Sequence, residues 1–158
     1  MASTMKFLSN ALLILVAAFS IASAMGDDYV VVGAKADFGS EVSDVNELRA
    51  VFMGEKLFWS DNERIFTILP DFNHASTAAF AQEVLGVDRQ QYLDYWRRKL
   101  FAGKGHPPRE TESDAEALGL LRANPGSVAI LSHEPKDSTG LVVLKVDPRS
   151  NRLVSAGL

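Results

Sequence analysis

Short oxygen-bearing side chains cluster in the stretch 70–86, where a β-rich run at 65–69 leads into an expected helix that ends at Gly86. A strand that feeds a helix through a polar turn points unsatisfied N–H groups and the positive end of the helix dipole at a potential anion. This chemistry would suit an anion. The candidate ligand-binding residues are Asn73, His74, Ala75, Ser76 and Thr77.

The same turn has a second interpretation. Asn, Ser and Thr are common at helix starts because their side chains accept hydrogen bonds from the first backbone N–H groups. Capping alone would explain Asn73, Ser76 and Thr77 without any ligand. If a ligand does bind, His74 would add positive charge below about pH 6.5. Both interpretations stay open from the residues alone.

No pattern in the chain indicates catalysis. The three histidines, His74, His106 and His133, lie far apart and match no metal-ligand spacing. The chain has no cysteine and no Gly-x-Ser-x-Gly elbow. The segment 103–105, Gly-Lys-Gly, follows a helix and lacks a Ser or Thr after its lysine, unlike a phosphate-binding loop. We therefore expect no enzyme, no catalytic residue, no metal site and no cofactor, although a site assembled from dispersed residues is an alternative.

The N-terminus is typical of a secretory signal peptide. Lys6 is the one charge before an apolar run at 7–21, and the small residues at 22–24, Ala-Ser-Ala, suit signal peptidase. We expect residues 1–24 to be removed, with the mature protein in the periplasm. An uncleaved anchor is the alternative, but the run is short for a membrane span.

Composition limits the mature chain. Removing 24 residues from 158 leaves 134, enough for one domain at 25–158. A chain without cysteine forms no disulfide, which suits a bacterial periplasm. Loss of Lys6 changes the net charge from −4 to −5, which argues against nucleic acid or an anionic membrane as a partner. No second segment approaches spanning length, so we expect no membrane insertion after cleavage.

Hydrophobic periodicity predicts alternating strands and helices. β-branched apolar runs predict strands at 29–32, 65–69, 127–131 and 141–146. Helices are expected to begin at the caps Asp44, Asp88 and Ser113, with Gly54 ending the first. This alternation predicts an α/β fold in which helices flank a mainly parallel sheet.

Several segments of the chain occur in an order that is known from one protein family. They are 51–59 (Val-Phe-Met-Gly-Glu-Lys-Leu-Phe-Trp), 80–86, Tyr95-Trp96, 101–108, 114–122 and 124–130. In this order they resemble the periplasmic phosphate-binding proteins of bacteria, which are the substrate-binding components of phosphate ABC transporters, and the resemblance covers roughly residues 29–131.

The resemblance implies one lobe of a type II periplasmic-binding fold, whose two α/β lobes close over an anion. In that family a turn of the form Arg-x-x-Gly-Ser-Gly-Thr supplies much of the phosphate site. Here Ser76 stands at the threonine position, His74 at the serine and Ala75 at the second glycine, while Pro70 stands at or near the arginine. The arginine and the second lobe are both absent, so we expect weak or degenerate phosphate binding.

Two functions follow. The first is an exported, anion-binding protein of the phosphate-transporter type in reduced form, in which a homodimer or a membrane transporter or sensor partner supplies the opposing wall. The second is a non-transport module that docks on a sensor or membrane receptor. Its docking surface would be an aromatic patch around Phe58-Trp59 or Phe72, and both places also suit a buried core.

Overall fold

The computed structural model describes residues 29–147 and 150–156. The signal peptide predicted for residues 1–24 lies outside these residues. Within them, no helix is both long enough and apolar enough to cross a bilayer.

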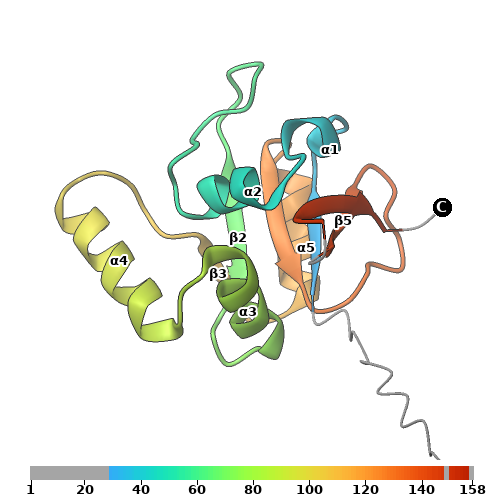
Figure 1. The fold of residues 1–158 in the computed structure, drawn as a ribbon. Coiled ribbons are helices and arrows are strands. Elements are labelled where there is room, and N and C mark those ends of the chain that lie inside the picture. The colour runs from blue at the N-terminus through green and yellow to red at the C-terminus, as the bar shows by residue number, and fades with distance from the viewer. Residues whose placement is uncertain (1–28, 148–149, 157–158) are drawn as a thin grey trace, which may run out of the picture.

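A six-stranded sheet forms the centre of the protein (Figure 1). Its strand order is β3-β2-β4-β1-β5-β6. The strands are β1 (Val30–Gly33), β2 (Phe66–Pro70), β3 (Arg109–Thr111), β4 (Ser127–Leu131), β5 (Val142–Asp147) and β6 (Arg152–Ser155). The four runs expected to form strands do so. The other two strands are β3, too short and too polar to be expected from its sequence, and β6, which pairs with β5.

The sheet is mixed, so the prediction of a mainly parallel sheet is wrong. β2 pairs in parallel with β3 and β4, whereas β1 is antiparallel to both β4 and β5, and β5 is antiparallel to β6. It follows that β2, β3, β4 and β5 point in one direction, with β1 running the opposite way between β4 and β5. The valines of β1 indicate a buried strand, but burial is compatible with either direction.

Most of the helices cover one face of the sheet. They are α1 (Phe38–Glu41), α2 (Val45–Phe52), α3 (Ala75–Phe80), the π-helix η1 (Ala81–Leu85) and α4 (Arg89–Phe101). Their apolar side chains pack against Val31, Leu69, Val128, Ile130 and Leu144 of the sheet. Phe52 and Phe80 are fully buried and meet edge to face, with ring centroids 4.8 Å apart.

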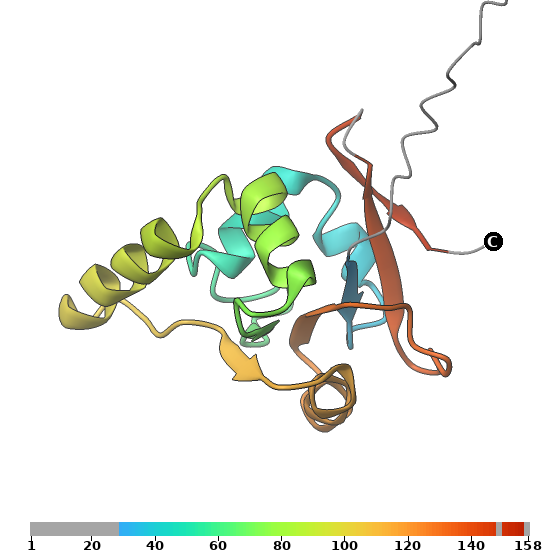
Figure 2. The ribbon, with the colours of Figure 1, turned by 90° about the horizontal axis from the view of Figure 1, so that it is seen from below.

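The opposite face is covered by α5 (Asp114–Ala123), as Figure 2 shows. Ala117 and Leu121 of this helix pack against Val32, Ile68 and Ala129. Because alternate residues of a strand point to opposite faces, the central strands β1 and β4 are buried on both sides.

Helix caps lie where the sequence places them. Asp44 accepts hydrogen bonds from the N–H groups of Asn46 and Glu47, Asp88 forms a capping box with Gln91, and Ser113 accepts from Glu116. Gly54 and Gly86 have positive φ, which lets the chain turn away from the preceding helix. The stretch 70–86 is helical only from Ala75 and changes to π-helix at Ala81.

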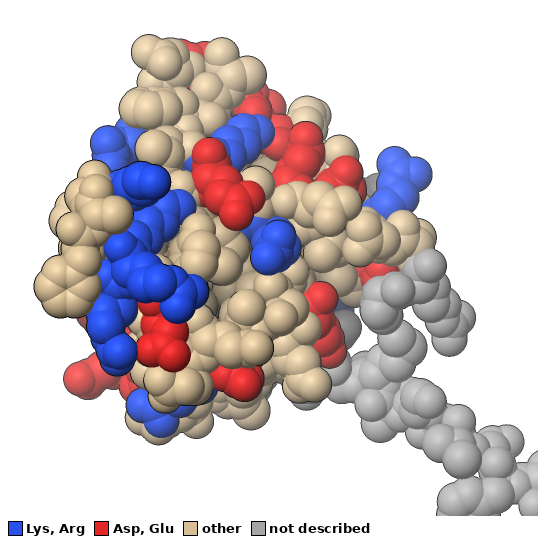
Figure 3. All heavy atoms as spheres, turned by 60° about the vertical axis from the view of Figure 1, so that its left-hand side comes forward, with Lys and Arg blue, Asp and Glu red and all other residues tan. Residues whose placement is uncertain are grey.

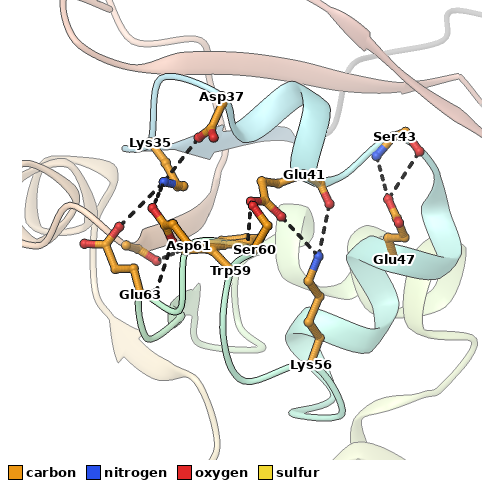
Figure 4. A network of polar contacts seen from close by, with 11 residues as sticks. Lys35, Asp37, Glu41, Ser43, Glu47, Lys56, Trp59, Ser60, Asp61 and Glu63 are labelled. Carbon is orange, nitrogen blue, oxygen red and sulfur yellow. Dashed lines mark hydrogen bonds and ion pairs between the residues drawn. The ribbon is translucent and has the colours of Figure 1, made fainter.

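The segment 57–65 folds back on itself and is held to the body by Trp59. Trp59 is buried, and its Nε1–H donates to the carbonyl of Gly126 at 3.0 Å. A surrounding polar network joins this segment to α1, with Lys35 paired to Asp61 and Glu41 bonded to Ser60 (Figure 4).

Candidate functional site

A topological switch point lies at the carboxyl ends of β2 and β4. From β2 the chain continues through α3, η1 and α4 to β3, and from β4 it continues to β5. In the strand order, β3 and β5 lie on opposite sides of the β2–β4 pair, so the two connections leave in opposite directions. In open α/β sheets, a ligand crevice forms where neighbouring parallel strands send their connections in opposite directions. The predicted ligand-binding residues, 73–77, follow β2 and lie at this switch point, so we call the region of 71–77 and 132–133 the switch-point site.

Two hydroxyl groups of the predicted site are turned inward. Thr77 is fully buried, and its Oγ1 donates to the carbonyl of Pro70 at 2.9 Å. Ser76 is 3% exposed, and its Oγ lies 3.1 Å from the Oγ of Ser132, which follows β4. The Thr77 bond therefore joins α3 to the end of β2. The contact between Ser76 and Ser132 joins the segments that follow β2 and β4.

The remaining residues of the predicted site lie closer to solvent. Asn73 and Ala75 are exposed and His74 is half-buried. His74 occupies the N-cap position of α3 without a side-chain capping bond. Among the described residues, no acceptor pairs with the N–H of Ala75 or of Ser76, and these two groups are the donors that the turn leaves available. The capping interpretation is thus not realised through the side chains.

A carboxylate from α5 occupies the neighbouring donors. Asp114 Oδ1 accepts the N–H of Ser132 at 2.9 Å, and its Oδ2 accepts the N–H of His133 at 3.2 Å. The Nδ1 atom of His133 lies 3.6 Å from the same Oδ2. Successive backbone N–H groups at a strand end are typical donors to an oxyanion. Here the anion that they hold belongs to the protein itself.

Sequence reasoning missed Asp114, Ser132 and His133 as members of this site. Ser76 and Ser132 are 56 residues apart in the chain, and Asp114 precedes Ser132 by 18. Only the parallel pairing of β2 with β4 brings these residues together. Only Asp114 could have been found from the sequence. It follows the Ser113 cap, so it is expected at the amino end of a helix.

No protein-family model matches the chain. No curated protein matches it either.

The switch-point site contains both hydrogen-bond donors and negatively charged side chains. The free N–H groups of Ala75 and Ser76, the Asn73 amide and two histidines favour an oxyanion. The carboxylates of Asp114 and Asp71 repel an oxyanion. Asp71 accepts the N–H of Asn73 at 2.6 Å. Two carboxylates beside a small set of donors allow a loosely held anion and disfavour a tightly held one.

Proposed function

We propose that this chain is an exported solute-binding-like protein related to the substrate-binding components of phosphate ABC transporters. On this proposal it is one lobe of a type II periplasmic-binding fold and holds phosphate or a similar oxyanion weakly at the switch point. The mixed sheet, with helices on both faces and a topological switch point at the ends of β2 and β4, supports the proposal.

The weak phosphate affinity is inferred mainly from the position of Asp114. Its carboxylate already holds the N–H groups of Ser132 and His133. A hydrogen bond to a charged group contributes about 1.5–3 kcal/mol, whereas two like charges 4 Å apart repel by about 4 kcal/mol at an effective dielectric constant near 20. Micromolar affinity needs about 8 kcal/mol net. The donors left at Ala75 and Ser76 fall short of that figure, so we expect millimolar binding.

A partner surface would strengthen phosphate binding. The switch-point site lies at the carboxyl ends of β2 and β4, where a second lobe would close over the ligand in the related transport proteins. A second copy of the chain, or a membrane transporter or sensor, could supply that wall. The proposal therefore makes the isolated monomer a poor phosphate binder and leaves closure to the assembly.

Calorimetry with inorganic phosphate on residues 25–158 tests the proposed site. We expect a dissociation constant in the millimolar range, weakened at least threefold by Ala75→Pro, which removes one free N–H at the first residue of α3, where proline is tolerated. Ser40→Ala, at an exposed serine of α1, provides the control, and circular dichroism checks that both variants fold. Micromolar binding by the monomer, or equal binding by the Ala75 variant, would contradict the proposal.

Export is tested separately. When the full chain is expressed in a Gram-negative bacterium, the mature protein should appear in the periplasmic fraction with Met25 as its first residue. Retention in the cytoplasm or in the membrane fraction would remove the exported part of the proposal without affecting the binding measurement.

The second candidate function is a non-transport docking module, favoured by one observation. Phe101 is 85% exposed at the end of α4, with Leu100 half-exposed beside it. The aromatic patch predicted earlier contributes less, because Trp59 is buried and Phe72 packs on Tyr92, which leaves Phe58 exposed. A photo-crosslinking residue at position 101 should capture a periplasmic or membrane partner if docking is the function, and Phe101→Ala should leave phosphate affinity unchanged.

A further inference from the structure

A cavity of about 660 Å³ lies at the amino ends of β2 and β3, away from the switch point. Its walls come from the end of α2, the segment 64–67, the α4 residue Trp96 and the loop 103–107. In Figure 1, α4 and the loop after it stand at one side of the molecule, facing α2 and β2. The length of β2, about 13 Å at 3.3 Å per residue, separates this cavity from the switch point.

The lining of the cavity is cationic. Its charged residues are Lys56, Arg64, Lys104, His106 and Arg109, and no Asp or Glu lines it. Lys56 is paired with Glu41. The side chains of the other four form no hydrogen bond and no ion pair with another described residue, although the guanidinium of Arg64 lies over the Phe58 ring, 6.0 Å from its centroid. Figure 3 shows Lys and Arg gathered on this face.

The surrounding sequence reinforces this charge. Residues 95–109 contain five Lys or Arg and no Asp or Glu, although the whole chain has a net charge of −4. Cations at the end of α4 complement its dipole. The fold adds Arg64 and Arg109 from the sheet to the loop cations Lys104 and His106. Positive charge in a concave site raises the local concentration of anions.

The rest of the lining is apolar and includes an aromatic ring. Val51, Leu57 and Ile65 contribute to the walls, together with Trp96. Two glycines border the indole. A Cβ at Gly54 would lie 2.9 Å from Cη2 of Trp96, and Gly105 has a φ of 143°, which side-chain-bearing residues rarely adopt. Small residues at these positions keep the space beside the ring open.

We propose that this cavity is a binding site for a small organic anion, one that joins a phosphate or carboxylate group to an apolar or aromatic body. The anionic group meets Arg64, Lys104, His106 and Arg109, while the apolar body packs on Trp96 and the aliphatic wall. The volume lies within the range of small-molecule sites, about 300–1,000 Å³. This cavity is separate from the switch-point site, and the proposal does not rest on the proposed function.

Phenyl phosphate is the probe, compared with phenol and inorganic phosphate in 0.15 M salt. Binding is followed by amide chemical shifts, which report where each compound binds. We expect shifts at Gly103, Lys104 and Gly105 and at the indole N–H of Trp96. The dissociation constant of phenyl phosphate should be at least tenfold lower than that of either fragment. Equal affinity for phenyl phosphate and one of its fragments, or shifts confined to residues 71–76 and 132–133, would overturn the proposal.

The matched variants are Arg64→Gln with Lys104→Gln, and Arg89→Gln with Arg98→Gln. Both double variants remove two exposed cations, and the second pair lies outside the cavity. Charges beyond about 8 Å are largely screened at this salt concentration. We expect the first pair to raise the dissociation constant of phenyl phosphate at least tenfold and the second to change it less than twofold. Equal effects would overturn the proposal, and circular dichroism checks that both variants fold.

Discussion

Lys99 donates from Nζ to the backbone carbonyl of Met53 at 2.7 Å. It also reaches the Gly54 carbonyl at 2.7 Å and the Tyr95 hydroxyl at 3.1 Å. A lysine on α4 thereby caps the carboxyl end of α2, where unsatisfied carbonyl groups favour a cation. Tyr95 donates to the same Met53 carbonyl at 2.7 Å. These bonds fasten α4 to the body of the protein.

Replacing Lys99 with methionine should loosen α4. Methionine preserves most of the aliphatic stem but leaves the carbonyls of Met53 and Gly54 without their charged donor. We expect hydrogen exchange in residues 89–101 to accelerate at least fivefold and stability to fall by about 1–3 kcal/mol. Lys104→Met is the control, because the Lys104 ammonium has no partner among the described residues. Equal protection of α4 in the two variants would show that Lys99 does not hold this helix.

Trp59→Phe tests how the segment 57–65 is anchored. The substitution removes the buried Nε1–H donor to the Gly126 carbonyl, which then retains only the Phe66 N–H at 3.2 Å. It also leaves unfilled space beside Phe38, whose ring centroid lies 5.9 Å from the indole. We expect a loss of about 2 kcal/mol in urea denaturation. Phe58→Leu, at an exposed neighbour, should change stability by less than about 0.5 kcal/mol.

The stability of the protein should fall in acid, in part through Glu41. The Ser60 hydroxyl and N–H and the Lys56 ammonium hold the pKa of the Glu41 carboxyl below its usual value of 4.5. A lowered folded-state pKa stabilises the protein at neutral pH, and this contribution is lost as the pH falls through that pKa.

Glu41→Gln should therefore lower the urea midpoint at pH 7, and this effect should shrink as the pH falls below 4.5 and through the lowered pKa of Glu41. The plot of stability against pH should become flatter over that range. Glu55→Gln serves as the control, because Glu55 is exposed and its carboxylate has no partner among the described residues. A Glu41 variant with the same acid dependence as the native chain would assign that dependence to other carboxyl groups.

Local signals in the sequence predicted most of the elements. Asp44, Asp88 and Ser113 mark helix starts because a capping oxygen acts within three residues of itself. The spacing of apolar residues in α4 is only partly informative. Tyr92, Trp96 and Leu100 recur four residues apart with Leu93 beside them, which predicts a buried stripe. Tyr92 and Trp96 are buried, whereas Leu93 and Leu100 are 38% and 48% exposed, because α4 meets the body along a narrow face.

Long-range relationships were beyond the sequence. The direction of β1 depends on its neighbours β4 and β5, which lie about 100 residues further along the chain. The short helix α1 lies in the segment 33–43, whose polar and glycine-containing sequence predicts a connection, and it is held by burial of Phe38. In the candidate site, Ser76 could be predicted as part of a polar turn. Its contact with Ser132, and the carboxylate of Asp114 on the neighbouring N–H groups, depend on the finished sheet.

The central claim is that Asp114 holds the place of an external oxyanion, and calorimetry of Asp114→Asn with inorganic phosphate tests it most directly. Asparagine keeps an oxygen for one N–H while removing the negative charge. The matched control is Glu134→Gln, which removes an exposed charge one residue beyond His133. The account predicts that Asp114→Asn binds phosphate at least tenfold more tightly than the native chain, with less than a twofold change in the control. Phosphate affinity that stays the same or weakens in Asp114→Asn would contradict it.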